Sequence, residues 1–133
     1  MEDTQLMKKV SDVLAAYPEI QLGVVFGSAV SGTMRADSDV DVAVLGQESL
    51  SLSLRLELIT ELSLAVGREV DVVDLYSAHG VILRQVLTKG IAVLERTKRG
   101  RAALMKRMLF DQSDMEPYRR RMTEVRLQRG FNG

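Results

Sequence analysis

Apolar residues follow two different spacings along this chain. Residues 3–17 carry one apolar stripe at helical spacing and end at Pro18, which predicts a helix. Short runs rich in Val, Ile and Leu, each bounded by Gly, Ser or Asp, predict strands. We expect strands over 20–26, 40–45, 69–75 and 91–94.

The segments between these strands predict further helices. Two of them begin after a serine that can cap a helix and end at a glycine that can stop it. These are 52–66, between Ser51 and Gly67, and about 79–89, between Ser77 and Gly90.

The chain after the last predicted strand also has helical spacing. Ala102, Leu104, Met105, Met108 and Leu109 form the expected stripe. A helix from about residue 97 should break at Pro117, because a proline inside a helix costs about 3 kcal/mol, and a last helix is expected over 117–128.

The order of the elements predicts the fold class. Residues 40–45 are apolar on both faces, so this strand should be central in its sheet. We expect an α/β (α+β) fold, with a mixed four-stranded sheet backed by helices and a C-terminal helical extension. The length of 133 residues suits one domain, with a core over 1–95 and basic helices over 96–133 as part of the same domain.

Composition narrows the class of protein. The chain contains no cysteine, which excludes disulfides and thiolate metal sites. No apolar stretch approaches the roughly 20 residues that span a bilayer, and the acidic N-terminus is unlike a secretory signal. We therefore expect a cytoplasmic protein that does not bind membranes.

The net charge of zero hides an uneven distribution. Residues 1–95 carry 7 Lys and Arg against 14 Asp and Glu, whereas residues 96–133 carry 11 against 4. The basic end could be a solvated helix face or a docking surface for an acidic partner or a nucleic acid. Interleaved Met and Leu favour the solvated face, so nucleic-acid binding is not expected.

The strongest chemical signal is a pair of aspartates at the start of the second strand. Asp39 and Asp41 lie two residues apart, so in an extended chain they point to the same face. Two such charges about 4 Å apart repel by about 4 kcal/mol at an effective dielectric constant of about 20. A divalent cation that prefers hard oxygen ligands, such as Mg²⁺, would offset this repulsion.

Two other interpretations of the surrounding residues fail. The alternating acids resemble a calcium-binding EF-hand loop, but Val42 occupies the position where the sharp turn of that loop requires glycine. The glycine-rich run that begins at Gly27 approaches a phosphate-binding P-loop, but Thr33 stands where that motif requires lysine.

A third carboxylate is expected from the neighbouring strand. Asp71 and Asp74 are both available, and their spacing of three places them on opposite faces, so only one can join the pair. Asp71 lies at the same depth in its strand as Asp41 and is favoured. Asp74 remains the alternative.

The Gly27-Ser28 turn, followed by ten residues and then Asp39-Val40-Asp41, resembles the signature of DNA polymerase beta-like nucleotidyltransferases in their minimal (MNT) form. Residues 67–75 resemble the part of that family that carries the third acid. Ser31 departs from the pattern, because many members have arginine there. Among these proteins, the chain looks most similar to the MntA-type antitoxins that pair with HEPN-domain ribonuclease toxins.

The resemblance implies a site and an activity. Asp39, Asp41 and Asp71 would hold Mg²⁺ and be catalytic, and Gly27 and Ser28 would anchor the triphosphate of ATP. The implied reaction transfers AMP to a tyrosine hydroxyl of the HEPN toxin, which neutralises it. Two alternatives stay open: a nucleotidyltransferase with a small-molecule or RNA acceptor, and a non-catalytic antitoxin that acts by binding alone. A homo- or hetero-oligomer is compatible with each.

Overall fold

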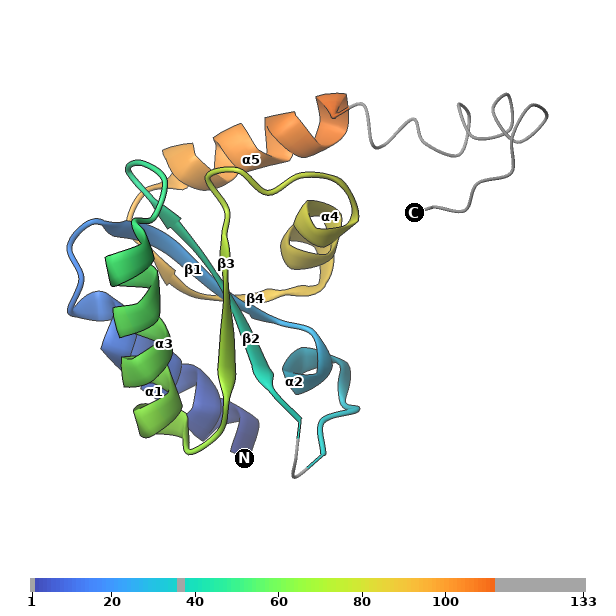
Figure 1. Cartoon of the computed structure of the whole chain (residues 1–133). Coiled ribbons are helices and arrows are strands. Elements are labelled where there is room, and N and C mark those ends of the chain that lie inside the picture. Colours follow the sequence, from blue (N-terminus) through green and yellow to red (C-terminus); the bar gives the residue numbers. More distant parts are fainter. Residues whose placement is uncertain (1, 36–37, 112–133) are drawn as a thin grey trace, which may run out of the picture.

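A four-stranded mixed sheet forms the centre of the molecule, as expected from the sequence. The computed structural model describes residues 2–35 and 38–111 (Figure 1). The strands are β1 (Ile20–Phe26), β2 (Val40–Gly46), β3 (Val70–Asp74) and β4 (Ile91–Glu95). They lie in the order β3-β2-β1-β4, with β2 central. β1 runs antiparallel to both β2 and β4, whereas β2 and β3 are parallel.

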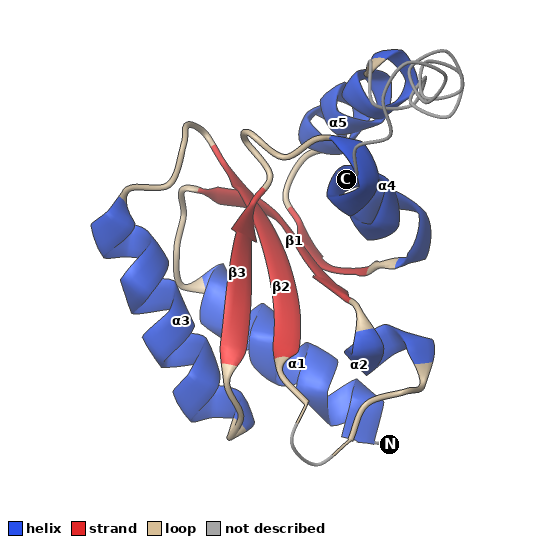
Figure 2. Cartoon of the chain, turned by 45° about the vertical axis from the view of Figure 1, so that its right-hand side comes forward, coloured by secondary structure: helices blue, strands red, loops and turns tan. Residues whose placement is uncertain are grey.

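Helices cover both faces of the sheet (Figure 2). α1 (Glu2–Ala15) and α3 (Leu52–Val66) pack on one face, and α4 (Gly80–Lys89) and α5 (Lys98–Phe110) pack on the other. The alternation along β2 divides its side chains between the two cores. Val40, Val42 and Val44 join the core under α1 and α3, and Ala43 and Leu45 join the core under α4 and α5.

Several element boundaries agree with the sequence patterns. The first strand and the helix over 52–66 have the predicted ends. Ser51 caps α3 by accepting a hydrogen bond from the amide of Leu54, and Gly67 ends the helix with φ 73°. The helical turn expected near residues 29–31 is the short α2 (Ser28–Ser31).

The predicted cap of the fourth helix was wrong. α4 begins at Gly80, so His79 rather than Ser77 precedes its first turn, and His79 makes no side-chain cap. The carboxylate of Asp111 instead accepts a hydrogen bond from the Gly80 amide at 3.0 Å. A residue 31 positions further along the chain supplies the cap, and such a partner is invisible in a local pattern.

The end and the stripe of α5 also differ from expectation. The helix ends at Phe110 rather than near Pro117, because Asp111 leaves the helix where it bonds α4. Gly100, Leu104 and Met108 are buried, whereas Ala102, Met105 and Leu109 of the predicted stripe are exposed, Leu109 by 66%. The helix expected over 117–128 lies outside the described residues. Within residues 2–35 and 38–111, every helix is too short or too polar to cross a bilayer.

Candidate active site

Three strand ends meet at one edge of the sheet and bring two of the predicted acids together. Asp41 is the register partner of Asp71 across the parallel β2–β3 pair and of Phe26 across the antiparallel β1–β2 pair. Partners in register project from the same face, so Phe26, Asp41 and Asp71 form one row across three strands. Phe26 belongs to the core under α4 and α5, so the row lies on that face of the sheet.

Asp39 lies just outside this row. It precedes the first residue of β2, and its side chain is exposed, as is that of Asp71. Asp41 is half-buried between the fully buried Val40 and Val42. The site therefore contains one half-buried carboxylate, that of Asp41, and two exposed ones.

The electrostatics of Asp41 show that the acids act on one another. Burial raises the pKa of its carboxyl above 3.8, and the charges of Asp71 and then Asp39 raise it further. A cation bound here would reverse the last two effects. A positive charge placed among these carboxylates would lower their mutual repulsion.

The turn after β1 presses directly on this carboxylate. Gly27 has φ 80°, a conformation that L side chains rarely adopt. A Cβ atom at this position would overlap the carboxylate oxygen of Asp41, so only glycine permits the approach. α2 begins at Ser28, and the first amides of a helix have no intrahelical acceptor. The amides of Val30 and Ser31 bond back to the carbonyl of Gly27.

Asp74, the alternative third acid, is engaged elsewhere. It pairs with Val44, three positions along the ladder from the Asp41–Asp71 pair. Its carboxylate accepts hydrogen bonds from the amides of Leu50 and Tyr76, both at 2.9 Å, and from Ser49 Oγ at 3.2 Å. These bonds fix the loop before α3 and the turn after β3. The geometry therefore favours Asp71.

The donor set suits magnesium that shares its ligands with a substrate. In the part of the chain that the structure describes, no three His, Cys, Asp or Glu side chains gather closely enough to form a complete metal cage. Magnesium is commonly held by one or two carboxylates, with substrate phosphates completing its shell. Neighbouring aspartates beside the Gly27 backbone fit that kind of site.

Sequence reasoning missed one residue near these acids. Arg68 donates hydrogen bonds to the carbonyls of Arg35 and Ser38, in the loop that leads to Asp39. No local motif signals this contact, because the partners lie 30 or more positions apart in the sequence.

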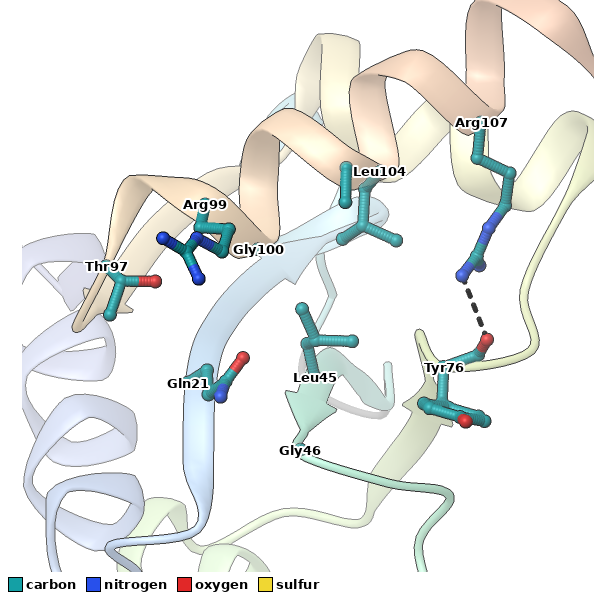
Figure 3. A pocket seen from close by; sticks show the side chains of 10 residues that line it. Gln21, Leu45, Gly46, Tyr76, Thr97, Arg99, Gly100, Leu104 and Arg107 are labelled. Carbon is teal, nitrogen blue, oxygen red and sulfur yellow. Dashed lines mark hydrogen bonds between the residues drawn. The ribbon is translucent and has the colours of Figure 1, made fainter.

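A separate cavity of about 570 Å³ lies at the opposite end of β2, under α5 (Figure 3). Leu45 and Gly46 line it from β2, and Arg99 and Arg107 line it from α5. Arg107 is committed to backbone carbonyls, including that of Tyr76 at 3.0 Å. The aspartates are at the start of β2, so this cavity is not part of the acidic site.

A mixed sheet with acids at the starts of two strands, and a glycine-serine turn at the end of a third, is the arrangement of a nucleotidyltransferase. Residues 8–99 match the family model described as polymerase beta, nucleotidyltransferase, and the chain belongs to this family. It is 38% identical over 90 residues to protein adenylyltransferase MntA of Shewanella oneidensis. The match covers 68% of this chain and 63% of that protein, so the chain spans less than two thirds of MntA.

Individual chains in solved structures of toxin-antitoxin complexes have the same fold. One, a toxin-antitoxin with AMP-PNP, superposes with a TM-score of 0.76 at 30% identity, covering 90% of this chain and 96% of the other. Another is the MNT antitoxin in complex with a tri-AMPylated HEPN toxin from Shewanella oneidensis. It has a TM-score of 0.71 at 27% identity and covers 92% of this chain and 97% of the other.

Proposed function

We propose that this protein is an antitoxin adenylyltransferase, which transfers AMP from ATP to a tyrosine hydroxyl of a HEPN-type toxin and so neutralises it. The similarity to MntA and to complexes of MNT antitoxins with HEPN toxins supports this class of reaction and partner. The observation that carries the proposal is the row of Asp41 and Asp71 in register, with the backbone of Gly27 pressed against Asp41.

Each predicted residue has a role in this reaction. Asp39 and Asp41 would hold one Mg²⁺, and Asp41 and Asp71 would share a second. Gly27 and the start of α2 at Ser28 would receive the triphosphate, because glycine allows close approach and free amides donate to phosphate oxygens. Bound magnesium would lower the pKa of the attacking hydroxyl and balance the charge on the phosphates.

Asp71 is suited to accept the proton of the acceptor. It lies at the exposed end of the row, where an incoming hydroxyl can reach it, whereas Asp41 is half-buried. The hydroxyl oxygen bonds to the α-phosphorus of ATP, the bond to the bridging oxygen breaks, and pyrophosphate leaves. The products are the AMP ester of the toxin and pyrophosphate.

The test is intact-mass measurement of the partner toxin. A HEPN-type toxin, to be sought among the neighbouring reading frames, is incubated with the purified protein, Mg²⁺ and ATP, and we expect its mass to increase in steps of one AMP. The doubly substituted Asp39→Asn, Asp41→Asn protein should transfer none and remain folded by circular dichroism. A toxin that is inhibited without any gain in mass would show an antitoxin that acts by binding alone.

A further inference from the structure

Arg68 bonds the backbone of Arg35 and Ser38, shortly before Asp39. One guanidinium nitrogen of Arg68, Nη1, donates to the carbonyl of Arg35 at 2.6 Å and to that of Ser38 at 3.0 Å. Arg35 and Ser38 also bond one another. The Ser38 amide donates to the Arg35 carbonyl at 3.1 Å, and the Arg35 amide donates to Ser38 Oγ at 2.8 Å. Arg68 thus holds two residues that also bond one another, not a single carbonyl.

The contact between Arg68 and Ser38 lies two residues beyond the end of the β2–β3 ladder. The Val40 amide donates to the Glu69 carbonyl at 2.9 Å, and Val40 pairs in register with Val70. Asp39 lies between Val40, which Glu69 holds, and Ser38, which Arg68 holds. The backbone on both sides of Asp39 is therefore tied to two consecutive residues just before β3, Arg68 and Glu69.

These two contacts on either side of Asp39 matter because Asp39 itself lies outside the sheet. Its side chain is exposed, and β2 begins only at the following residue. Fixing one residue of a free loop costs about 1–2 kcal/mol in backbone entropy. A loop held in place beforehand does not pay that cost when a metal binds.

We infer that Arg68 is a positioning residue, which holds Asp39 beside Asp41 and Asp71 so that magnesium and nucleotide bind together. This inference rests on the proposed function. Arg68 acts on Asp39 through the carbonyls of Arg35 and Ser38. It therefore couples the end of α3 to the acidic site.

Arg107 provides a matched control. It holds a different turn in the same way, with hydrogen bonds to the carbonyls of Leu75, Tyr76 and Ala78. That turn follows β3, whereas the aspartates lie at the start of β2 and β3. Replacing either arginine by glutamine removes hydrogen bonds to backbone carbonyls. Only the bonds of Arg68 hold the backbone next to Asp39.

The experiment is a calorimetric titration of AMP-PNP into the whole protein at a series of Mg²⁺ concentrations, below the unfolding temperature of each variant. For Arg68→Gln we expect the Mg²⁺ concentration at half-maximal binding to rise about tenfold, which corresponds to about 1.4 kcal/mol. Arg68→Lys keeps a donor of the same charge and should shift it less. Arg107→Gln should lower thermal stability without changing the Mg²⁺ dependence.

The outcomes separate this inference from the proposed function. An Arg68→Gln protein that is folded and has the wild-type Mg²⁺ dependence overturns the positioning role and leaves the proposed function intact. A wild-type protein that does not bind AMP-PNP with Mg²⁺ overturns both. If Arg68→Gln does not fold, Arg68→Lys decides, because a lysine amine cannot take the position of the guanidinium nitrogen that bonds both carbonyls. An unchanged Mg²⁺ dependence in that variant overturns the role equally.

Discussion

Burial and two neighbouring carboxylates disfavour the charged form of Asp41. Asp41 is the half-buried member of an otherwise fully buried strand segment, and two further aspartates raise its pKa. A charged group in such a position lowers the stability of the fold unless a partner compensates it. Ionised Asp41 therefore lowers the free energy of unfolding, and a bound cation would offset this loss.

Asp41→Asn should abolish AMP transfer and leave the fold at least as stable as the wild type at neutral pH. The carboxyl pKa is raised in the folded state, so the folded protein binds the proton more tightly than the unfolded chain. Ionised Asp41 therefore destabilises the fold as pH rises above about 3.8 and through the raised folded-state pKa. Urea unfolding across this range measures it: the gain from Asp41→Asn should shrink as pH falls. A variant that is less stable than wild type at neutral pH contradicts this account.

Gly27→Ala should damage the site more than a matched glycine substitution. Both Gly27 and Gly32 have positive φ, at 80° and 83°, so alanine strains the backbone at either position. The cost is about 1 kcal/mol for the left-handed Gly32 and about 1–3 kcal/mol for Gly27, which lies outside the left-handed region. Only at Gly27 does the new Cβ meet the Asp41 carboxylate, because nothing lies within 4 Å of a Cβ at Gly32.

We expect transfer to be lost in Gly27→Ala, whereas Gly32→Ala should show mainly the loss of stability. Activity assays and thermal unfolding of the two variants compare them directly. Equal activity in both would show that the close approach at Gly27 has no role in the reaction.

At the scale of elements, α4 and α5 stabilise one another through their ends. Asp111 at the end of α5 bonds the Gly80 amide of α4, and Arg107 bonds the carbonyls of the segment that leads to α4. Leu104 and Met108 of α5 and Leu83 and Val86 of α4 share the core on that face of the sheet. Removing the cap therefore tests a contact between two helices as well as a helix end.

Asp111→Ala should destabilise the protein by about 1 kcal/mol, the usual value of a helix N-cap. Asp111→Asn keeps a carbonyl oxygen that can accept from the Gly80 amide, so it should cost less. Urea denaturation of both variants gives the difference. Equal losses would show that the charge of Asp111, and not its hydrogen bond, stabilises this helix end.

At the scale of the whole molecule, the two ends of the sheet differ. The acids and the glycine turn lie where β1 ends and β2 and β3 begin, whereas α5 covers the opposite end of β2. Because the described acids do not form a complete metal cage, nucleotide and magnesium should stabilise the fold together.

Thermal unfolding should therefore respond little to Mg²⁺ alone and strongly to Mg²⁺ with AMP-PNP. A ligand at one hundred times its dissociation constant stabilises a folded protein by about 2.7 kcal/mol. The Asp39→Asn, Asp41→Asn protein should show no added effect of the pair. A full shift with Mg²⁺ alone would instead indicate a metal site made entirely by the protein.

The sequence by itself determined the elements and the family. Runs of Val and Leu with glycine and serine punctuation predict the strands and α3, because burial and capping act over a few neighbouring residues. The Gly27-Ser28 turn and the Asp39/Asp41 pair could be predicted for the same reason. They lie between two strands that the local pattern predicts, at the end of one and the start of the other.

The tertiary structure alone decided which distant groups meet. The register between β2 and β3 pairs Asp41 with Asp71, while loop contacts engage Asp74. Packing of the two helices set the cap of α4 and the end of α5, and the fold brought Arg68 to the backbone before Asp39. These outcomes depend on hydrogen bonds between residues 20 or more positions apart, which local spacing does not encode.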